Sequence, residues 1–108
     1  MPQKFIILGS AQEEFKAIKQ YILRDFGSLV WQQVHAEYQA AFHLIKTQPK
    51  AGFAIDALQE LGIIHIRYQL VRQTRVVYEV HDDFILIHMF ISTKRDFITH
   101  LMHRLFHT

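Results

Sequence analysis

The sequence predicts an α+β domain of element order β-α-α-β-β-β-α, in which an N-terminal strand and an antiparallel helical hairpin pack with a mostly antiparallel sheet. Two observations predict this class. Apolar residues recur at helical spacing through residues 10–47, whereas residues 63–91 contain three strand-like runs separated by short turns. The chain has 108 residues, so we expect a single domain over residues 1–108.

The first strand and first helix are predicted from residues 4–26. Residues 4–8 form a short apolar run that suits a strand covered on both faces, and Gly9 ends it. Ser10 and Glu13 have the spacing of a capping box, in which each side chain satisfies the other residue's backbone N–H. The helix that follows carries an apolar stripe of Phe15, Ile18, Ile22 and Phe26, and Gly27 is expected to end it.

A second helix is predicted over residues 29–47, with Pro49 beyond its end. Its inner stripe consists of Trp31, Val34, Tyr38, Ala41 and Ile45. The linker is only two residues long, so the two helices should form an antiparallel hairpin. Residues 50–62 are less regular, and we expect one short helical turn over residues 55–61.

Three strands are predicted over residues 63–71, 74–80 and 84–91, joined by turns short enough for antiparallel pairing. In the first, one side carries Ile64, Ile66, Tyr68 and Leu70, and the other carries His65, Arg67 and Gln69. In the second, we expect Val76, Tyr78 and Val80 to face inward and Arg75, Val77 and Glu79 to face outward. The third is almost entirely apolar and should lie inside the sheet. Residues 94–106 then read as a final amphipathic helix.

Composition restricts the environment and the chemistry. The chain has no cysteine, which excludes disulfides and thiolate metal sites and favours a reducing compartment. The apolar run at its start is too short for a signal peptide, and the longest apolar run is too short to span a bilayer. We therefore expect a soluble, cytoplasmic domain. The formal net charge of +2 does not by itself indicate a nucleic-acid partner.

Histidine is abundant, with eight residues, but does not form a known metal-binding motif. His100, His103 and His107 share one face of the last predicted helix, yet no carboxylate stands at a suitable spacing beside them. We expect a solvated helix face there, and neither a metal nor another cofactor. His88 interrupts an apolar strand and is expected to be a hydrogen-bonded residue of the core or of an interface.

Several short motifs occur in a characteristic order along the chain. They are Phe5 to Ser10, Pro49 with Gly52, Leu61-Gly62-Ile63 leading to Arg67, Thr74-Arg75-Val76-Val77-Tyr78, and Lys94-Arg95-Asp96. This ordered set resembles the ParE/RelE superfamily of small bacterial toxins over nearly the whole chain, and most closely the ParE-like toxins of type II toxin–antitoxin systems. Thr74 stands where the superfamily usually has tyrosine.

The resemblance implies a function and two sets of contact residues. A ParE-like toxin is expected to arrest growth by binding and poisoning DNA gyrase, without catalysis, to contribute to plasmid stabilization, and to be neutralised by a cognate antitoxin. Target binding is expected from one converging cationic patch of Arg67, Arg75, Lys94 and Arg95. Antitoxin binding is expected from apolar residues of the last helix, namely Leu101, Met102, Leu105 and Phe106.

A RelE-like ribosome-dependent mRNA endonuclease is the alternative that the resemblance allows. Cleavage through the 2′-hydroxyl needs an acid, a base and cations around the phosphate. Arg75, Arg95 and His100 are the candidates for these roles. The lysine pair of such enzymes is missing, with Arg67 as the only cation in that strand, and Leu101 occupies the tyrosine position. A binding module that kept the fold without toxic activity is a third possibility.

Both cationic motifs also have structural interpretations. Arg75 can lie on the solvated face of the sheet, paired with Glu79, which is two positions along the same side of the strand. Lys94-Arg95-Asp96 can simply open a helix, with Asp96 near the positive end of the helix dipole.

Overall fold

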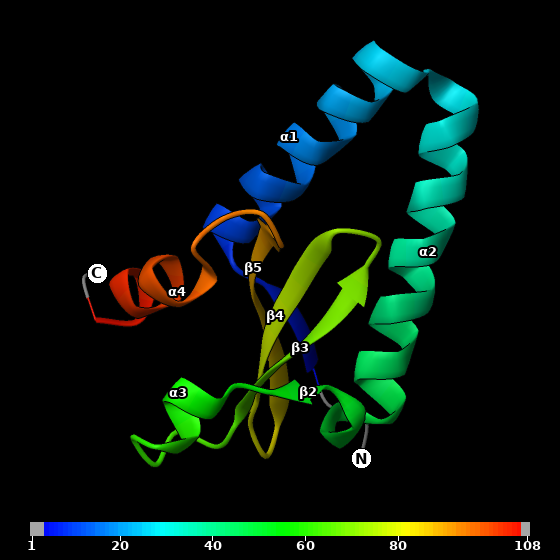
Figure 1. Ribbon diagram of the computed structural model, residues 1–108. Helices are drawn as coiled ribbons and strands as arrows, with labels where there is room; N and C mark the ends of the chain where they lie inside the picture. Colours follow the sequence, from blue (N-terminus) through cyan, green and yellow to red (C-terminus); the bar gives the residue numbers. More distant parts are fainter. Residues whose placement is uncertain (1–3, 107–108) are drawn as a thin grey trace.

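The computed structural model describes residues 4–106 and confirms the α+β class (Figure 1). A short 3₁₀ turn, η1, follows the helical hairpin. The elements are β1 (Lys4–Ile7), α1 (Gly9–Phe26), α2 (Ser28–Thr47), η1 (Pro49–Ala51), β2 (Phe53–Ala54), α3 (Asp56–Gln59), β3 (Ile66–Val71), β4 (Thr74–Val80), β5 (Phe84–Ser92) and α4 (Phe97–Phe106). None of the helices in the described residues is long and apolar enough to cross a membrane.

The strands form one five-stranded mixed sheet in the order β1-β5-β4-β3-β2. The three predicted strands β3, β4 and β5 pair antiparallel in succession, as expected from their short turns. β1 pairs parallel with β5, which therefore lies inside the sheet as predicted. β2 is a two-residue edge strand that the sequence did not predict, since residues 50–62 carry no strand-like alternation.

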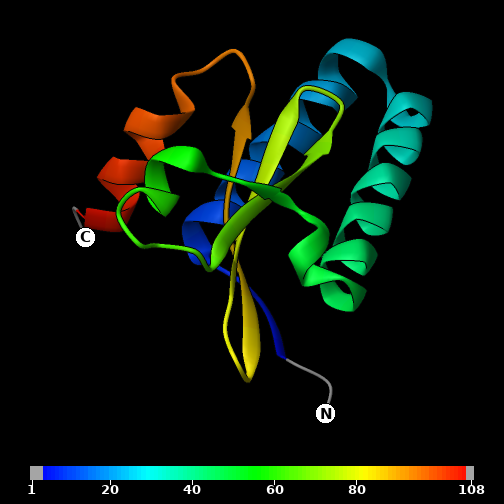
Figure 2. The ribbon, with the colours of Figure 1, turned by 60° about the horizontal axis from the view of Figure 1, so that its bottom comes forward.

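The sheet is covered on both faces, by different elements (Figure 2). The hairpin of α1 and α2 covers one face, hereafter the hairpin face, over a cluster that includes Val76, Tyr78 and Ile87. The segment containing α3 and helix α4 cover the opposite face, hereafter the α4 face, over a cluster that includes Val77 and Met89. The outward orientation predicted for Val77 is therefore wrong, because α4 buries it completely.

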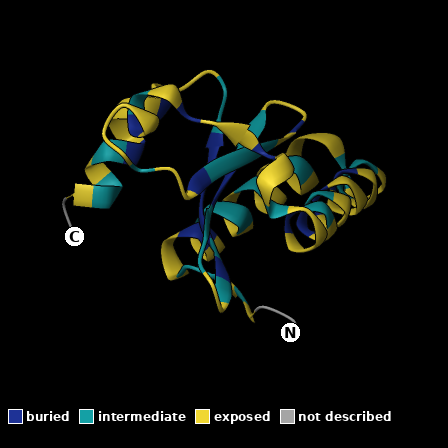
Figure 3. Ribbon diagram, turned by 90° about the horizontal axis from the view of Figure 1, so that it is seen from below, coloured by how far each residue is buried: buried dark blue, intermediate teal, exposed yellow. Residues whose placement is uncertain are grey.

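Aromatic rings fill the space between the helical hairpin and the sheet. Phe15 on α1 lies within 5.1 to 6.2 Å, centroid to centroid, of Trp31, Tyr38, Phe42 and Phe90. The contacts with Trp31 and Tyr38 are edge-on, a geometry that the ring quadrupole favours, and those with Phe42 and Phe90 are tilted. Figure 3 shows the result, with buried residues along the inner sides of the helices and exposed residues along their outer sides. Both predicted helical stripes thus face the sheet, except for Phe26, which is 57% exposed at the end of α1.

Several local predictions at element ends are corrected by the structure. Helix α1 begins at Gly9, its N-cap is Leu8, and no side chain caps it, so the capping box of Ser10 and Glu13 does not form. Ser10 lies inside the first turn, two residues after the N-cap, and so cannot fill that role. β1 is an edge strand and its Ile6 side chain is exposed, so the prediction that this strand is covered on both faces is wrong.

Helix α4 starts at Phe97, three residues later than predicted, because Asp96 caps it. The Thr99 backbone N–H donates to Asp96 Oδ1 at 3.2 Å, and the Thr99 hydroxyl donates to Oδ2 at 2.7 Å. These two hydrogen bonds lower the pKa of Asp96. Lys94 and Arg95 lie in the preceding turn, where both backbone N–H groups donate to Ser92.

A close approach of backbone and side chain requires glycine at position 52. The Tyr78 hydroxyl donates to the Pro49 carbonyl and lies where a Cβ on Gly52 would stand. Tyr78 is fully buried, so its ring cannot move aside easily. Burial is also the main reason that its pKa is raised.

We therefore predict that Gly52→Ala lowers the free energy of unfolding by about 1–3 kcal/mol, because the new methyl group overpacks the Tyr78 ring. Urea denaturation measures this quantity directly. Gly9→Ala is the matched control, since nothing lies within 4 Å of a Cβ at that position. Equal losses at the two positions would contradict the packing argument.

Candidate functional site

A β-bulge in β5 organises the polar residues on the α4 side of the sheet. The ladder pairs Val77 with Met89 but Tyr78 with Ile87, so His88 is an extra residue without a partner in β4. A bulge of this kind leaves backbone groups unpaired and bends the strand. Here the parallel partner β1 also ends before this point, because its last ladder contact is with Ile87.

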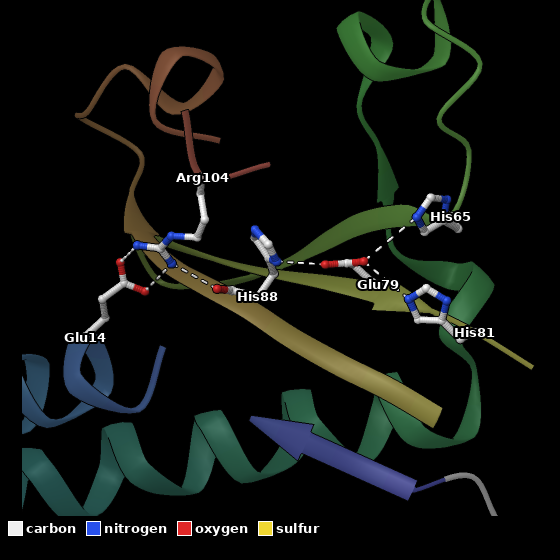
Figure 4. A network of polar contacts seen from close by, with 6 residues as sticks. All are labelled: Glu14, His65, Glu79, His81, His88 and Arg104. Atoms are coloured by element: carbon white, nitrogen blue, oxygen red, sulfur yellow. Dashed lines mark hydrogen bonds and ion pairs between the residues drawn. The ribbon is translucent and has the colours of Figure 1, made fainter. Parts of the chain in front are cut away.

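Side chains from two helices that are distant in the sequence, α1 and α4, form hydrogen bonds with the unpaired backbone groups at the bulge (Figure 4). The Phe90 N–H donates to Glu14 Oε1 at 3.1 Å, and the His88 carbonyl accepts from Arg104 at 2.9 Å. Arg104 also binds both carboxylate oxygens of Glu14, at 3.1 and 2.7 Å. One carboxylate and one guanidinium therefore connect α1, β5 and α4.

On the other side of the bulge, three imidazoles surround one carboxylate (Figure 4). Glu79 Oε2 lies 2.7 Å from His88 Nδ1, while Oε1 lies 3.3 Å from His81 Nε2 and 3.9 Å from His65 Nε2. His88 is 6% exposed, and its Nε2 has no hydrogen-bond partner among residues 4–106. The predicted core position of His88 is confirmed, with Glu79 as its polar neighbour.

The pKa of Glu79 is lowered by this environment. The interaction with His88 contributes most, burial opposes it, and His81 adds to the lowering. The arrangement keeps Glu79 ionised among groups that can carry positive charge. Charged and hydrogen-bonded carboxylates of this kind occur at functional sites and in purely structural networks.

The cationic residues that the sequence indicated do not form one patch. Arg67 pairs across the ladder with Tyr78, and its Nη1 donates to the Gly52 carbonyl at 3.0 Å, which places it on the hairpin face. Arg75 lies on the α4 face, with its guanidinium 4.7 Å from the Phe97 ring centroid. The predicted convergence of all four cations is wrong for Arg67, because adjacent strands present it and Arg75 to opposite faces.

The other three cations lie at one end of the sheet. Arg75 pairs with Ile91 near the end of β5, and Lys94 and Arg95 follow directly in the turn to α4. The Arg75 guanidinium lies over the rings of Phe97 and Tyr68, and its Nε and Nη1 are buried without hydrogen-bond partners in the described residues. Its expected pairing with Glu79 is not observed.

An open cavity of about 580 Å³ lies beside this turn, between α1, β5 and α4. Its lining includes Arg95, His100, His103, Glu14 and Arg104. Two candidates of the endonuclease alternative, Arg95 and His100, therefore share a cavity that Arg75 does not line.

The residues of α4 predicted to bind a partner differ in exposure. Leu101 is completely buried against the sheet, so it is part of the core and not of the surface. Met102 and Leu105 are half-buried and pack on the same cluster. Phe106 is 61% exposed and Ile98 is 36% exposed. His107 lies outside the described residues.

Comparison with known proteins identifies the class of protein that this fold represents. The model of the family described as ParE toxin of type II toxin-antitoxin system, parDE, matches residues 5–97. The chain therefore belongs to the ParE toxin family, and the resemblance drawn from the sequence is confirmed.

A solved structure shares the fold. It is described as the chromosomal ParDE TA system from P. aeruginosa, and its matching chain aligns with a TM-score of 0.65 at 10% sequence identity. The alignment covers 84% of this chain and 96% of that one. No curated protein matches the chain significantly.

The contacts at the bulge predict a strong energetic coupling between Glu14 and Arg104. We expect Arg104→Met to lower the free energy of unfolding by about 1–3 kcal/mol, since it leaves a half-buried carboxylate and the His88 carbonyl without their donor. A double-mutant cycle with Glu14→Gln should give a coupling energy of about 1–2 kcal/mol. The exposed Glu13–Lys16 pair is the control, with an expected coupling below about 0.5 kcal/mol. Equal coupling in both pairs would exclude a special role for the bulge.

The lowered pKa of Glu79 predicts a pH dependence of stability. A carboxyl whose pKa is lower in the folded chain stabilises the fold fully above its unfolded pKa, about 4.3, and this contribution is lost as the pH falls through the folded value. Wild-type protein should therefore lose stability more steeply than Glu79→Gln between about pH 5 and pH 3. Chemical denaturation at several pH values measures the two slopes, and parallel profiles would contradict the prediction.

Proposed function

We propose that this member of the ParE toxin family arrests growth by binding DNA gyrase and that a cognate antitoxin neutralises it. The observation that carries the proposal is the family match over residues 5–97, which includes the whole sheet except Lys4, the first residue of β1. The toxin acts as a binding protein in this proposal, without catalysis, in the cytoplasm.

The target-binding surface is proposed at the end of the sheet that carries the turn before α4. Lys94 and Arg95 are exposed there and available to a macromolecular partner. The Arg75 guanidinium supports the turn by stacking on the ring of Phe97, the first residue of α4. Arg67 occupies the hairpin face and is not part of this proposed surface.

The buried state of Arg75 is the reason to favour binding over RNA cleavage. Two of its guanidinium nitrogens are enclosed by protein, whereas a phosphate-stabilising arginine must present its N–H groups to the substrate. The acid and base of a nuclease would then have to come from Arg95, His100 and their neighbours without that cation.

The antitoxin is proposed to bind the outer side of α4. Phe106 provides the exposed apolar anchor, and the half-buried Met102 and Leu105 lie next to it on the helix. An amphipathic or extended segment that orders on binding suits such a strip. Leu101 contributes indirectly by fixing α4 on the sheet.

Purified gyrase tests the target. The wild-type chain should inhibit DNA supercoiling at stoichiometric amounts, and the Lys94→Glu, Arg95→Glu double variant should lose at least about 10-fold in potency because it reverses the charge of the turn. The Lys16→Glu, Lys50→Glu double variant makes the same charge change elsewhere on the exposed surface and should remain potent. If the wild-type protein does not inhibit gyrase, and cells that make it show cleaved messages and arrested translation, the target is the ribosome and not gyrase.

Co-expression tests the antitoxin. The product of the neighbouring gene should restore growth to cells that make the wild-type chain. Phe106→Glu should stay toxic but escape this rescue, because it places a charge in the proposed apolar contact. Leu29→Glu, at an exposed leucine at the start of α2 in the helical hairpin, should be rescued like wild type. Equal rescue of all variants would remove α4 from the antitoxin interface.

A further inference from the structure

The part of the sheet where β3 begins and β4 ends carries a second group of polar side chains, separate from the turn before α4. His65 precedes β3, Glu79 lies in β4 and His81 follows it. Each offers one ligand atom, and the three atoms all lie within 4.8 Å of one another. This group includes none of the residues assigned above to gyrase or to the antitoxin.

We propose that His65, His81 and Glu79 bind a divalent transition-metal ion, with zinc as the best-fitting metal. Two imidazoles and one carboxylate are a common zinc ligand set that leaves a fourth position for water. Bond lengths of about 2.0–2.2 Å place tetrahedral ligand atoms roughly 3.4 Å apart. The distances from Glu79 Oε1 to the two imidazole nitrogens are 3.3 and 3.9 Å, so each of these pairs closes by less than an ångström. The two imidazole nitrogens lie within 4.8 Å of each other, so they close by about 1.4 Å at most.

The surroundings of the three ligands hold them in place. His88 Nδ1 lies 2.7 Å from the second carboxylate oxygen, which leaves Glu79 Oε1 directed at the other two imidazoles. The His81 ring stacks on Phe84 with a centroid distance of 4.3 Å. The His65 backbone is fixed by the Val80 N–H, which donates to its carbonyl at 2.8 Å. Such outer contacts, which orient the ligands, are typical of metal sites.

The site is also accessible from solvent. The side chains of His65 and His81 are 44% and 34% exposed, whereas that of Glu79 is 14% exposed. Both histidines line an open cavity of about 600 Å³, and Asp82 lines it too. A hydrated ion can enter through this cavity and exchange water for the two imidazoles, while the less accessible carboxylate balances part of its charge.

A bound ion would join the loop before β3 to the turn between β4 and β5. It would thereby close the end of the sheet opposite the turn that carries Lys94. This inference stands apart from the proposed function, since zinc binding is measured on the isolated chain without gyrase or antitoxin.

The test uses the full chain made by cell-free synthesis, without an affinity tag and stripped of metals by a chelator. Isothermal titration with zinc chloride should show one site, and zinc should raise the melting temperature by about 5 °C or more. His65→Ala and His81→Ala should each weaken binding at least about 10-fold. Cobalt added in place of zinc should give the intense visible absorption of a four-coordinate ion.

The control is the double variant His100→Ala, His103→Ala, which removes the histidines of α4 and leaves the proposed ligands intact. It should bind zinc like wild type. Metal-free thermal unfolding of each variant verifies that it folds, and His65 and His81 are exposed enough for alanine to be tolerated. Absence of binding in zinc excess, binding unchanged in both single variants, or binding lost only in the control would overturn the proposal.

Discussion

The extra residue in β5 is the constraint on which the arrangement of this protein depends. His88 has no partner in β4, so the chain must satisfy backbone groups that a regular ladder would pair. A buried polar group without a partner costs about 1–3 kcal/mol. Glu14 and Arg104 remove that cost, and in doing so they attach the first and last long helices to the same point of one strand.

The same extra residue determines the polar network on the neighbouring strand. The insertion changes the alternation of β5, so that Ile87 belongs to the cluster under the helical hairpin while Met89 belongs to the cluster under α4. The His88 side chain then reaches Glu79. Glu79 is thereby mostly shielded from solvent, with its other carboxylate oxygen turned towards His81, which is the geometry that makes the metal inference possible.

The helices and the three main strands were predictable because their apolar periodicity is strong. Phe15, Val34 and Tyr38 occupy the inner faces that their spacing indicated. The bulge was not predictable, since the run around His88 is apolar on both sides and fits several registers. β2 has two residues and pairs through its backbone alone, which leaves no pattern in the side chains.

The candidate site was predictable only in part, and the reason is the double coverage of the sheet. If one face of the sheet were solvated, the alternation of apolar and polar residues would have shown which face carries Arg67 and which carries Arg75. With both faces buried, apolar residues occur on each, and the relative phase of β3 and β4 follows only from their pairing, Arg67 with Tyr78 and Leu70 with Arg75. The cluster around Glu79 was also missed, because His65 and His81 are brought together by strand pairing and not by spacing.

The double coverage has a consequence for the natural history of this family. β4 supplies alternate side chains to two separate apolar clusters. The insertion or deletion of one residue within β4 would therefore turn the side chains beyond it to the opposite face of the sheet. Insertions and deletions during divergence should therefore occur in turns, at strand ends, and at the β-bulge of β5, where side chains of α1 and α4 already satisfy the backbone around the extra residue. That restriction allows most of the sequence to drift while the architecture persists, as the 10% identity with a chain of the same fold illustrates.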